Sequence, residues 1–385
     1  MQCRLSRSTV AVWLAVVLAL TGEASRAQDI AVPAPPKLGF KSHYLADFET
    51  GAVLAEADAD EQLPPASLTK LMTAYVVFSA LRDGAIRLDD DVPISEKAWR
   101  TGGTRMFVEV GSHVSAEDLI HGMLIQSGND ASVALAEHVA GTVPKFVELM
   151  NEQAARLGMT NTLFRNPTGL PAAGHVSTAH DLATLAKGLI AEFPQYYPLY
   201  SQREFTYNGI RQHNRNSLLW RDPSVDGMKT GHTAAAGYCL VTSAQRDGMR
   251  LIAVIMGASS ARARTDGAEK LLDYGFDAYE TRKLYSAGEQ LSVARVWGGI
   301  PEVTPLGLER DLFVTIPRGH YQSLSATLDL SNQLVAPLDE GTQVGEVKVR
   351  LAGNPLSHVP LVVLGQVPEG GLWTKLVDKI DLWLE

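Results

Sequence analysis

The sequence predicts an α/β fold of the α+β kind, in which an antiparallel sheet is flanked by helices and a small all-β domain follows. Two observations predict it. Segments with a helical period and segments that alternate like strands are interspersed from residue 42 to about residue 280. After about Arg282, only short alternating runs remain, punctuated by glycine and proline. The chain of 385 residues is long enough for both units to bury a core.

Residues 1–27 are predicted to be a secretory signal peptide that is not part of the fold. Arg4 and Arg7 give a positive start, residues 10–20 are almost wholly apolar, and Ser25-Arg26-Ala27 offers small residues at the cleavage positions. The apolar run is too short to span a bilayer as a mature helix. A membrane anchor that stays attached is the alternative.

Helices are predicted in the larger domain, which we place at residues 28–285. Their sequences show apolar side chains at helical spacing or a capping residue at the start, as in Thr178-Ala179-His180-Asp181. They are expected at residues 68–81, 116–125, 131–139 and 178–190, with a closing helix that includes residues 271–279.

Strands are predicted toward both ends of the same domain. An extended leader rich in alanine and proline, residues 28–38, precedes the first of them. The expected pairs are 43–48 with 51–55, and 238–244 with 251–256. Asp247-Gly248 lies between the second pair and favours a tight antiparallel hairpin.

The remaining chain is predicted to form an all-β domain at residues 286–368 and an amphipathic helix at residues 369–385. Strand-like runs occupy 312–316, 324–330 and 345–351. An apolar stripe on one face of the last helix comprises Trp373, Leu376, Val377, Ile380, Trp383 and Leu384. Two tryptophans favour contact with a membrane surface, whereas docking onto the β domain or pairing with a second copy is the alternative.

Charge and cysteine content limit the function further. A net charge of −9 argues against binding nucleic acid, which requires lysine and arginine to neutralise phosphates. Cys3 leaves with the signal peptide, so Cys239 stands alone and no internal disulfide is expected. Its apolar neighbours predict a buried structural thiol.

Ser67-Leu68-Thr69-Lys70 is the first candidate for catalytic chemistry, at the start of a predicted helix. A serine and a lysine three residues apart share one helix face. The positive end of the helix favours negative charge on the serine oxygen, and a neutral lysine can accept the serine proton. Alone the pattern is weak, because an N-cap serine followed by a solvated lysine has the same spacing.

Two further motifs follow in the chain. Ser127-Gly128-Asn129 lies between two predicted helices, where it can aim a hydroxyl and an amide at one point, although an ordinary helix connection is the alternative. Lys229-Thr230-Gly231 leads into the predicted sheet. A lysine there would push Lys70 toward its neutral form by charge repulsion. Gly231 would let a substrate backbone approach the strand closely.

The three motifs in this order are those of penicillin-binding proteins and class A β-lactamases. The chain resembles the low-molecular-mass penicillin-binding proteins of the D-alanyl-D-alanine carboxypeptidase type over nearly everything after the signal peptide. Residues 65–73 and 226–233 carry the resemblance, and an all-β domain with an amphipathic end is also typical of that family. The resemblance implies a β-lactamase/transpeptidase-like catalytic domain.

The resemblance also implies catalytic roles. Ser67 would be the acylated nucleophile, Lys70 its general base and Ser127 the group that passes a proton to the leaving D-alanine. Asn129 would bind the amide carbonyl of the substrate. The backbone N–H groups of Ser67 and His232 would form the oxyanion hole.

Other residues are implied to hold the substrate carboxylate. Lys229 and Thr230 would assist there and in the proton relay, with Gly231 beside them. Arg215 and Arg264 match arginines that the family places near the site, and a bidentate arginine suits a free carboxylate. Either arginine could instead be a structural ion-pair residue.

The implied partners are peptidoglycan stem peptides ending in D-Ala-D-Ala, β-lactam antibiotics as covalent inhibitors, and the membrane surface through the C-terminal helix. The implied location is the periplasm, on the outer face of the inner membrane, with a part in cell wall synthesis. No metal or cofactor is expected, since His175 and His180 lack the spacing of a metal-binding pair.

Three other functions compete with this interpretation. A β-lactamase would share the motifs, but class A enzymes need a glutamate for deacylation and residues 161–170 contain none. An endopeptidase that cleaves cross-links would use identical chemistry with a larger leaving group. A non-catalytic wall-binding protein is disfavoured, because every motif residue is present.

Overall fold

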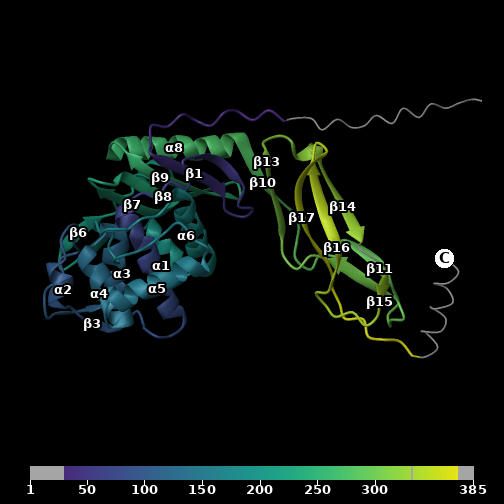
Figure 1. The fold of residues 1–385 in the computed structure, drawn as a ribbon, viewed down its shortest axis with the longest axis horizontal. Helices are drawn as coiled ribbons and strands as arrows, with labels where there is room; N and C mark the ends of the chain where they lie inside the picture. The colour runs from purple at the N-terminus through teal and green to yellow at the C-terminus, as the bar shows by residue number, and fades with distance from the viewer. Residues whose placement is uncertain (1–29, 331–332, 372–385) are drawn as a thin grey trace, which may run out of the picture.

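The computed structural model describes residues 30–330 and 333–371 (Figure 1). A domain of helices around a sheet is followed by an all-β domain, so the predicted fold class is confirmed. The predicted signal peptide lies outside the described residues, as do residues 372–385 of the predicted C-terminal helix. No helix in the described parts of the chain combines the length and apolar character needed to cross a bilayer.

A five-stranded antiparallel sheet with the order β2-β1-β9-β8-β7 lies at the centre of the first domain. Its strands are β1 (Ser42–Asp47), β2 (Val53–Ala57), β7 (Val225–Thr233), β8 (Gly237–Arg246) and β9 (Met249–Ala258). Both predicted strand pairs are confirmed. Asp247 and Gly248 have φ values of 49° and 83° in the turn between β8 and β9, as a tight hairpin requires.

Alternation along each strand explains how the sheet is covered on both faces. In β9, Leu251, Ala253 and Ile255 pack on one side with the apolar face of α8 (Ala261–Ala278). Ile252, Val254 and Met256 point to the other side, into the core formed with the remaining helices. Successive strand side chains leave opposite faces, so a near-continuous apolar run is what a doubly covered strand needs.

A layer of helices covers the second face of the sheet, and its first helix, α1 (Lys70–Arg82), begins just after Ser67. The other helices of this layer are α2 (Glu96–Arg100), α3 (Ala116–His121), α4 (Asn129–Ala140), α5 (Val143–Arg156) and α6 (Ala179–Glu192). The short helix α7 (Leu218–Arg221) instead packs with α8 on the first face, through Leu218 and Leu219. Short strand pairs β3 (Asp91–Pro93) with β4 (His113–Ser115), and β5 (Glu204–Tyr207) with β6 (Ile210–His213), lie at the periphery.

Local sequence signals account for most helix boundaries. Thr178 Oγ1 accepts from the Asp181 N–H at 3.0 Å, which confirms the predicted cap of α6. A 3-10 turn, Ala66–Thr69, forms the first part of the predicted helix 68–81, and a π-turn, Gly122–Gln126, ends the predicted helix 116–125. The closing helix α8 begins ten residues earlier than the predicted stretch and is capped by Ser260.

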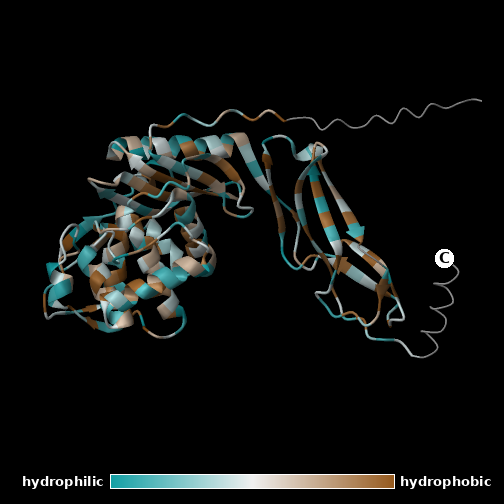
Figure 2. Ribbon diagram, in the orientation of Figure 1, coloured by the Kyte–Doolittle hydropathy of each residue, from teal (hydrophilic) through white to brown (hydrophobic). Residues whose placement is uncertain are grey.

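The β domain contains a mixed six-stranded sheet with the order β14-β16-β17-β12-β11-β15 and a two-stranded pair, β10 with β13. The strands are β10 (Tyr279–Tyr285), β11 (Ser292–Trp297), β12 (Val303–Gly307), β13 (Leu312–Pro317), β14 (Leu324–Leu330), β15 (Leu334–Val335), β16 (Gln343–Leu351) and β17 (Asn354–Val363). Figure 2 shows hydrophobic and hydrophilic residues alternating along the strands. The hydrophobic residues facing inward form one core, which includes Val314, Ile316, Val347 and Leu361.

The two domains are joined by the direct passage of α8 into β10 and by polar contacts (Figure 1). Thr281 Oγ1 in β10 donates to Asp47 Oδ2 at 2.7 Å, at the end of β1. The guanidinium of Arg318 donates to the Phe276 carbonyl in α8 at 2.9 Å from Nε. These contacts fix the β domain beside one edge of the catalytic domain.

Candidate active site

A cavity of about 410 Å³ opens where the start of α1, the connection before α4, strand β7 and helix α8 meet. It is lined by Ser67, Thr104, Ser127, Arg215, Thr230, Gly231, His232, Tyr238, Ala261 and Arg264. Seven of these are residues that the sequence singled out. The other three singled-out residues, Lys70, Asn129 and Lys229, are buried at this site. Lys70 is hydrogen-bonded to Ser67 and to Asn129.

Ser67 lies in a 3-10 turn at the start of α1, and the backbone around it is tightly packed. Ala66 has a φ of 48°, in the left-handed region that non-glycine residues seldom adopt. A Cβ atom on Gly231 would lie 3.2 Å from the Ser67 backbone nitrogen. The absence of a side chain at position 231 therefore lets β7 approach the serine N–H closely.

Lys70 is fully buried one turn after Ser67, and its amine makes three short contacts. Nζ lies 3.1 Å from Ser67 Oγ, 2.6 Å from Asn129 Oδ1 and 2.7 Å from the Thr168 carbonyl. Burial lowers the pKa of Lys70 well below its ordinary value, and the nearby positive charge of Lys229 lowers it further. An amine that loses its proton easily is the base that a serine hydroxyl needs.

Ser127 and Asn129 reach the site from the connection between the π-turn and α4. Ser127 has a φ of 68°, and this left-handed conformation turns the chain at the end of the π-turn. Asn129 is the first residue of α4, and its Nδ2 donates to the Gly102 carbonyl at 2.7 Å. The amide of Asn129 is thus held between Gly102 and Lys70, a contact that the sequence did not reveal.

Lys229 is the second buried lysine at the site, on the central part of β7. It is 2% exposed, and its Nζ donates to the Thr230 carbonyl at 3.1 Å. Burial lowers its pKa to about 7, and the positive charges of Arg215 and Arg264 act in the same direction. The repulsion predicted between Lys229 and Lys70 is part of the electrostatics of this site.

Arg215 and Arg264 line the same cavity but differ in exposure and in hydrogen bonding. Arg264, on α8, is 7% exposed, and among the described residues its buried Nε atom has no hydrogen-bond partner. Arg215 is exposed, and its Nε donates to the Gln126 carbonyl at 3.3 Å. An unsatisfied guanidinium N–H group on an arginine that lines a cavity is a candidate donor to an anion.

Three contributors were not found from the sequence. The Thr168 carbonyl holds Lys70, and Tyr238 stacks on the His232 ring at 4.0 Å between centroids. The carboxylate of Asp130, directly after Asn129, accepts from Met106 N at 3.0 Å and Phe107 N at 2.9 Å. Asp130 thereby fixes the segment that carries Thr104. The sequence signal that could have identified Asp130 is an acidic residue at the start of a predicted helix.

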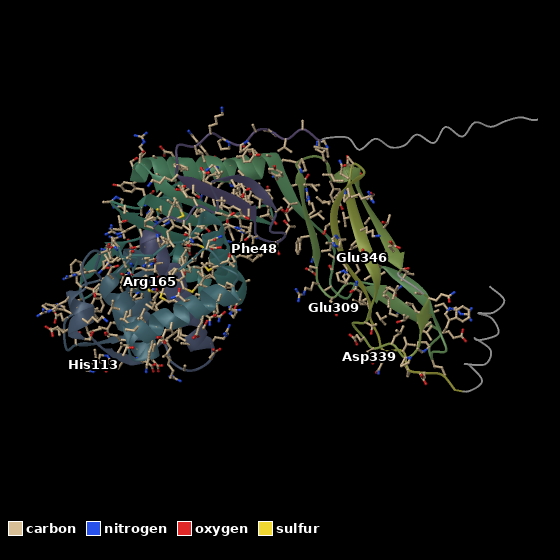
Figure 3. All side chains as sticks on the ribbon, in the orientation of Figure 1. Phe48, His113, Arg165, Glu309, Asp339 and Glu346 are labelled. Atoms are coloured by element: carbon tan, nitrogen blue, oxygen red, sulfur yellow. The ribbon has the colours of Figure 1, made fainter. Side chains whose placement is uncertain are left out.

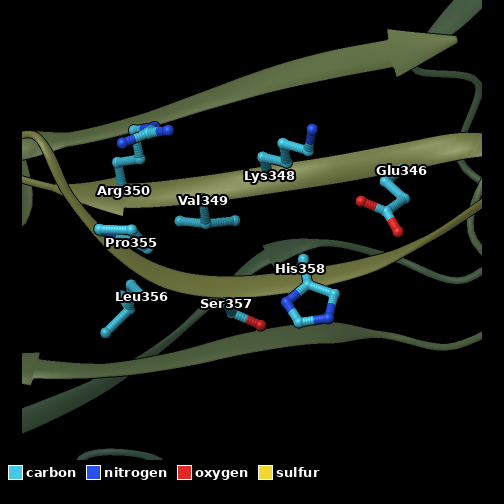
Figure 4. A pocket seen from close by; sticks show the side chains of 8 residues that line it. All are labelled: Glu346, Lys348, Val349, Arg350, Pro355, Leu356, Ser357 and His358. Atoms are coloured by element: carbon cyan, nitrogen blue, oxygen red, sulfur yellow. The ribbon is translucent and has the colours of Figure 1, made fainter.

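A second hollow lies on the β domain between β16 and β17 (Figure 4). Ser357 and His358 both line it, but they are consecutive in β17, so their side chains leave opposite faces of the strand. Lys348 is paired there with Asp329 at 2.6 Å. Among the described residues no hydrogen bond joins Ser357 to His358 or Lys348, so the hollow lacks a paired nucleophile and base like Ser67 and Lys70. Nowhere in residues 30–330 and 333–371 do three His, Cys, Asp or Glu side chains gather as metal ligands.

Cys239 lies in β8 beside Gly231 and is buried, as predicted. His180 is exposed and contacts Asp60 at 3.2 Å, whereas His175 is buried and bonded to Thr69. The two histidines therefore lie in different environments, one buried and one exposed.

Comparison with known proteins places this architecture in a family. A family model described as D-alanyl-D-alanine carboxypeptidase matches residues 29–260, and one described as penicillin-binding protein 5, C-terminal domain, matches residues 279–369. The chain is 45% identical over 360 residues to the D-alanyl-D-alanine carboxypeptidase DacC of Escherichia coli strain K12, covering 90% of each chain.

Solved structures agree with the sequence comparison. Penicillin-binding protein 5 from Haemophilus influenzae superposes with a TM-score of 0.84 at 42% identity, covering 88% of this chain and 100% of the other. Penicillin-binding protein 6B from Escherichia coli superposes with a TM-score of 0.73 at 38% identity, covering 86% and 97%. With both domains matched and the three motifs gathered at one cavity, this chain belongs to the D-alanyl-D-alanine carboxypeptidase family.

Proposed function

We propose that this protein is a serine-type carboxypeptidase that removes the terminal D-alanine from peptidoglycan pentapeptide stems. The observation that carries the proposal is the 3.1 Å contact between Ser67 Oγ and the buried amine of Lys70 beside a substrate-sized cavity. The names of the relatives support the substrate class, and the similarity to a penicillin-binding protein from Haemophilus influenzae supports reaction with penicillins. β-Lactams would acylate the same serine.

Acylation begins with transfer of the Ser67 proton to Lys70. A neutral amine has two N–H groups and one lone pair. The Asn129 amide oxygen and the Thr168 carbonyl, at 2.6 Å and 2.7 Å, take the two N–H groups. The lone pair then faces Ser67 Oγ, which attacks the carbonyl carbon between the two D-alanines. The N–H groups of Ser67 and His232 would stabilise the resulting oxyanion.

Collapse of the tetrahedral intermediate breaks the C–N bond and releases D-alanine. The proton taken by Lys70 returns to the departing nitrogen through the Ser127 hydroxyl. Water then hydrolyses the ester at Ser67 and regenerates the enzyme. We assign Asn129 to the substrate's amide carbonyl as well as to Lys70.

The terminal carboxylate would bind on the β7 side of the cavity. Arg264 is the arginine best placed for this role, because its unsatisfied Nε is buried at the cavity wall. Lys229, Thr230 and Arg215 add positive charge and a hydroxyl nearby. A carboxypeptidase needs this charge, because its substrate ends in a free carboxylate.

We propose the same domain limits and location as the sequence indicates. These are a signal peptide at 1–27, a peptidase domain at 28–285 whose last strand, β10, pairs with β13 of the next domain, an all-β domain at 286–368, and an amphipathic segment at 369–385 whose first residue, Glu369, lies in a β-bridge with Gly299. The mature protein would act in the periplasm on the outer face of the inner membrane, where it would limit cross-linking and so influence cell shape. The apolar stripe of the last segment supports contact with the membrane surface.

The test is release of free D-alanine from a pentapeptide by wild-type protein and by Ser67→Ala. We expect activity in the wild type and a loss of at least about 10³-fold in the variant, with an unchanged circular dichroism spectrum. Equal release by both proteins would contradict the proposal.

A cross-linked dimer of stem peptides, assayed in parallel, separates the competing functions. Faster cleavage of the cross-link than of the pentapeptide would make the protein an endopeptidase. Turnover of a chromogenic cephalosporin at many per second would make it a β-lactamase. Absence of all three activities, together with failure to react with labelled penicillin, would leave a non-catalytic wall protein.

A further inference from the structure

His175 lies outside the cavity that contains Ser67, yet its ring connects two parts of the catalytic machinery. The side chain is 4% exposed and packs edge-on against Phe164. Its Nε2 lies 2.9 Å from Thr69 Oγ1, in the turn between Ser67 and Lys70. Its Nδ1 lies 3.3 Å from Asn166 Nδ2, in the loop that crosses the base of the site.

The hydrogen bonds of Asn166 fix which nitrogen of His175 carries the proton. Asn166 Oδ1 accepts from the backbone N–H of Thr168 at 3.1 Å and of Gly169 at 2.8 Å. Backbone N–H groups only donate, so this amide atom is the oxygen and the atom facing His175 is the NH₂ group. Nδ1 must therefore accept, and the ring proton lies on Nε2, where it donates to Thr69 Oγ1.

The loop that Asn166 holds is the one that orients the catalytic amine. The two bonds from Thr168 and Gly169 to Asn166 set the direction of the Thr168 carbonyl, which accepts from Lys70 Nζ at 2.7 Å. The same loop packs directly on the nucleophile turn, since a Cβ on Gly169 would lie 1.8 Å from the Ala66 carbonyl oxygen. An ångström of movement in this loop would move the acceptor away from Lys70.

We propose that His175, as a neutral imidazole protonated on Nε2, is a positioning residue that braces the Asn166 loop against the Ser67–Lys70 turn and so aims the lone pair of Lys70 at Ser67. The proposal rests on the proposed serine mechanism. It adds that the acylation rate depends on a side chain that touches neither the substrate nor the reacting atoms.

The surroundings of His175 keep its ring neutral. Burial lowers the pKa of His175 to about 4, and the positive charge of Arg165 (labelled in Figure 3) acts in the same direction. The other groups that face the ring are Thr69, Asn166 and Phe164, none of which titrates as an acid at neutral pH. A second ring proton would point Nδ1–H at the NH₂ group of Asn166, so protonation would break the brace.

The test compares penicillin acylation in four full-length proteins: wild type, His175→Phe, His175→Gln and Thr69→Val. Phe fills the space of the imidazole ring but makes neither of its hydrogen bonds. Val fills the space of Thr69 but lacks the hydroxyl that bonds to His175. Gln is neutral and offers one donor and one acceptor. The measurement is the saturating acylation rate constant and the half-saturating penicillin concentration, both normalised to the folded fraction.

We expect His175→Phe and Thr69→Val to lower the saturating rate constant about tenfold with little change in half-saturation, and His175→Gln to recover part of the loss. Equal rate constants in all four proteins, with lower melting temperatures in the variants, would make His175 a purely structural residue and overturn the proposal. If His175→Phe does not fold, the proposal is tested by the acylation rate constants of Thr69→Val, expected to be low, and of His175→Gln, expected to lie between that value and the wild-type value. A wild type that fails to react with penicillin would overturn the proposed function instead, so the two failures are distinguishable.

Discussion

The two buried lysines are the residues on which the chemistry depends. Burying an ammonium group in an apolar interior is energetically unfavourable, so burial lowers the pKa of both lysines and favours their neutral form. Nearby positive charges lower both pKa values further. The same burial that activates Lys70 costs folding free energy at neutral pH, since the unfolded chain would carry the proton. Placing the base in the core thus exchanges stability for reactivity.

The arginine at position 215 provides a test of this electrostatic account. Its charge lowers the pKa of both Lys70 and Lys229. Arg215→Gln should therefore raise the pKa of Lys70 and move the acid limb of the pH profile of the acylation rate to higher pH. Arg215→Lys keeps the charge and should leave the limb in place. A shift toward lower pH, or equal shifts in both variants, would contradict the account.

At the level of elements, the site is built from segment starts and turns rather than from the middles of helices. Ser67 precedes α1, Ser127 ends a π-turn, Asn129 opens α4 and Thr168 belongs to a loop. Positions of this kind leave backbone and side-chain groups free to meet a substrate. They also depend on close backbone contacts.

Gly169 is the glycine on which one such contact depends. Its φ is 84°, and a Cβ would lie 1.8 Å from the backbone oxygen of Ala66, which cannot move without shifting Ser67. Gly169→Ala should destabilise the protein by about 2 to 4 kcal/mol and slow acylation. The control is Gly174→Ala in the same loop, where φ is 71° but the nearest atom is the end of the Arg165 side chain at 3.4 Å.

The control substitution strains only the left-handed backbone, which costs about 1 kcal/mol, and should acylate normally. Thermal melting and penicillin labelling measure the two effects. Equal effects of the two substitutions would show that the contact between Gly169 and Ala66 has no special weight.

The same elements show what local sequence can and cannot predict. Ser67 and Lys70 were predicted because their three-residue spacing occurs together with two further motifs in the order typical of penicillin-binding proteins. The β8–β9 hairpin was predicted because Asp247-Gly248 favours its turn. The Thr168 carbonyl was not predicted, since a backbone group 98 positions from Lys70 leaves no trace in residue type. Helix α5 was not predicted either, although Thr142 caps it and Pro144 stands in its first turn.

At the scale of the whole molecule, two domains with separate cores share a polar joint. The end of β1 reaches β10 through Asp47 and Thr281, and Thr281 lies 2.9 Å from Thr315 on β13. Figure 1 shows β11 and β15 at the end of the β domain far from the catalytic domain. Gly370 N donates to Gly298 O at 2.7 Å near that end.

Composition and alternation predicted both domains, but not their joint. The joint forms from single polar side chains such as Thr281 and Arg318, and their partners are distant in the sequence. Periodicity reports which face of an element is buried, not which neighbour covers it.

Mass spectrometry of the intact protein after exposure to a penicillin shows whether Ser67 is acylated with the help of a neutral Lys70. We expect one adduct per chain, mapped to the peptide that contains Ser67, and no adduct on Ser67→Ala at any pH. Lys70→Met should form the adduct at least about 10³-fold more slowly. An adduct on another peptide, or undiminished labelling of either variant, would contradict this mechanism.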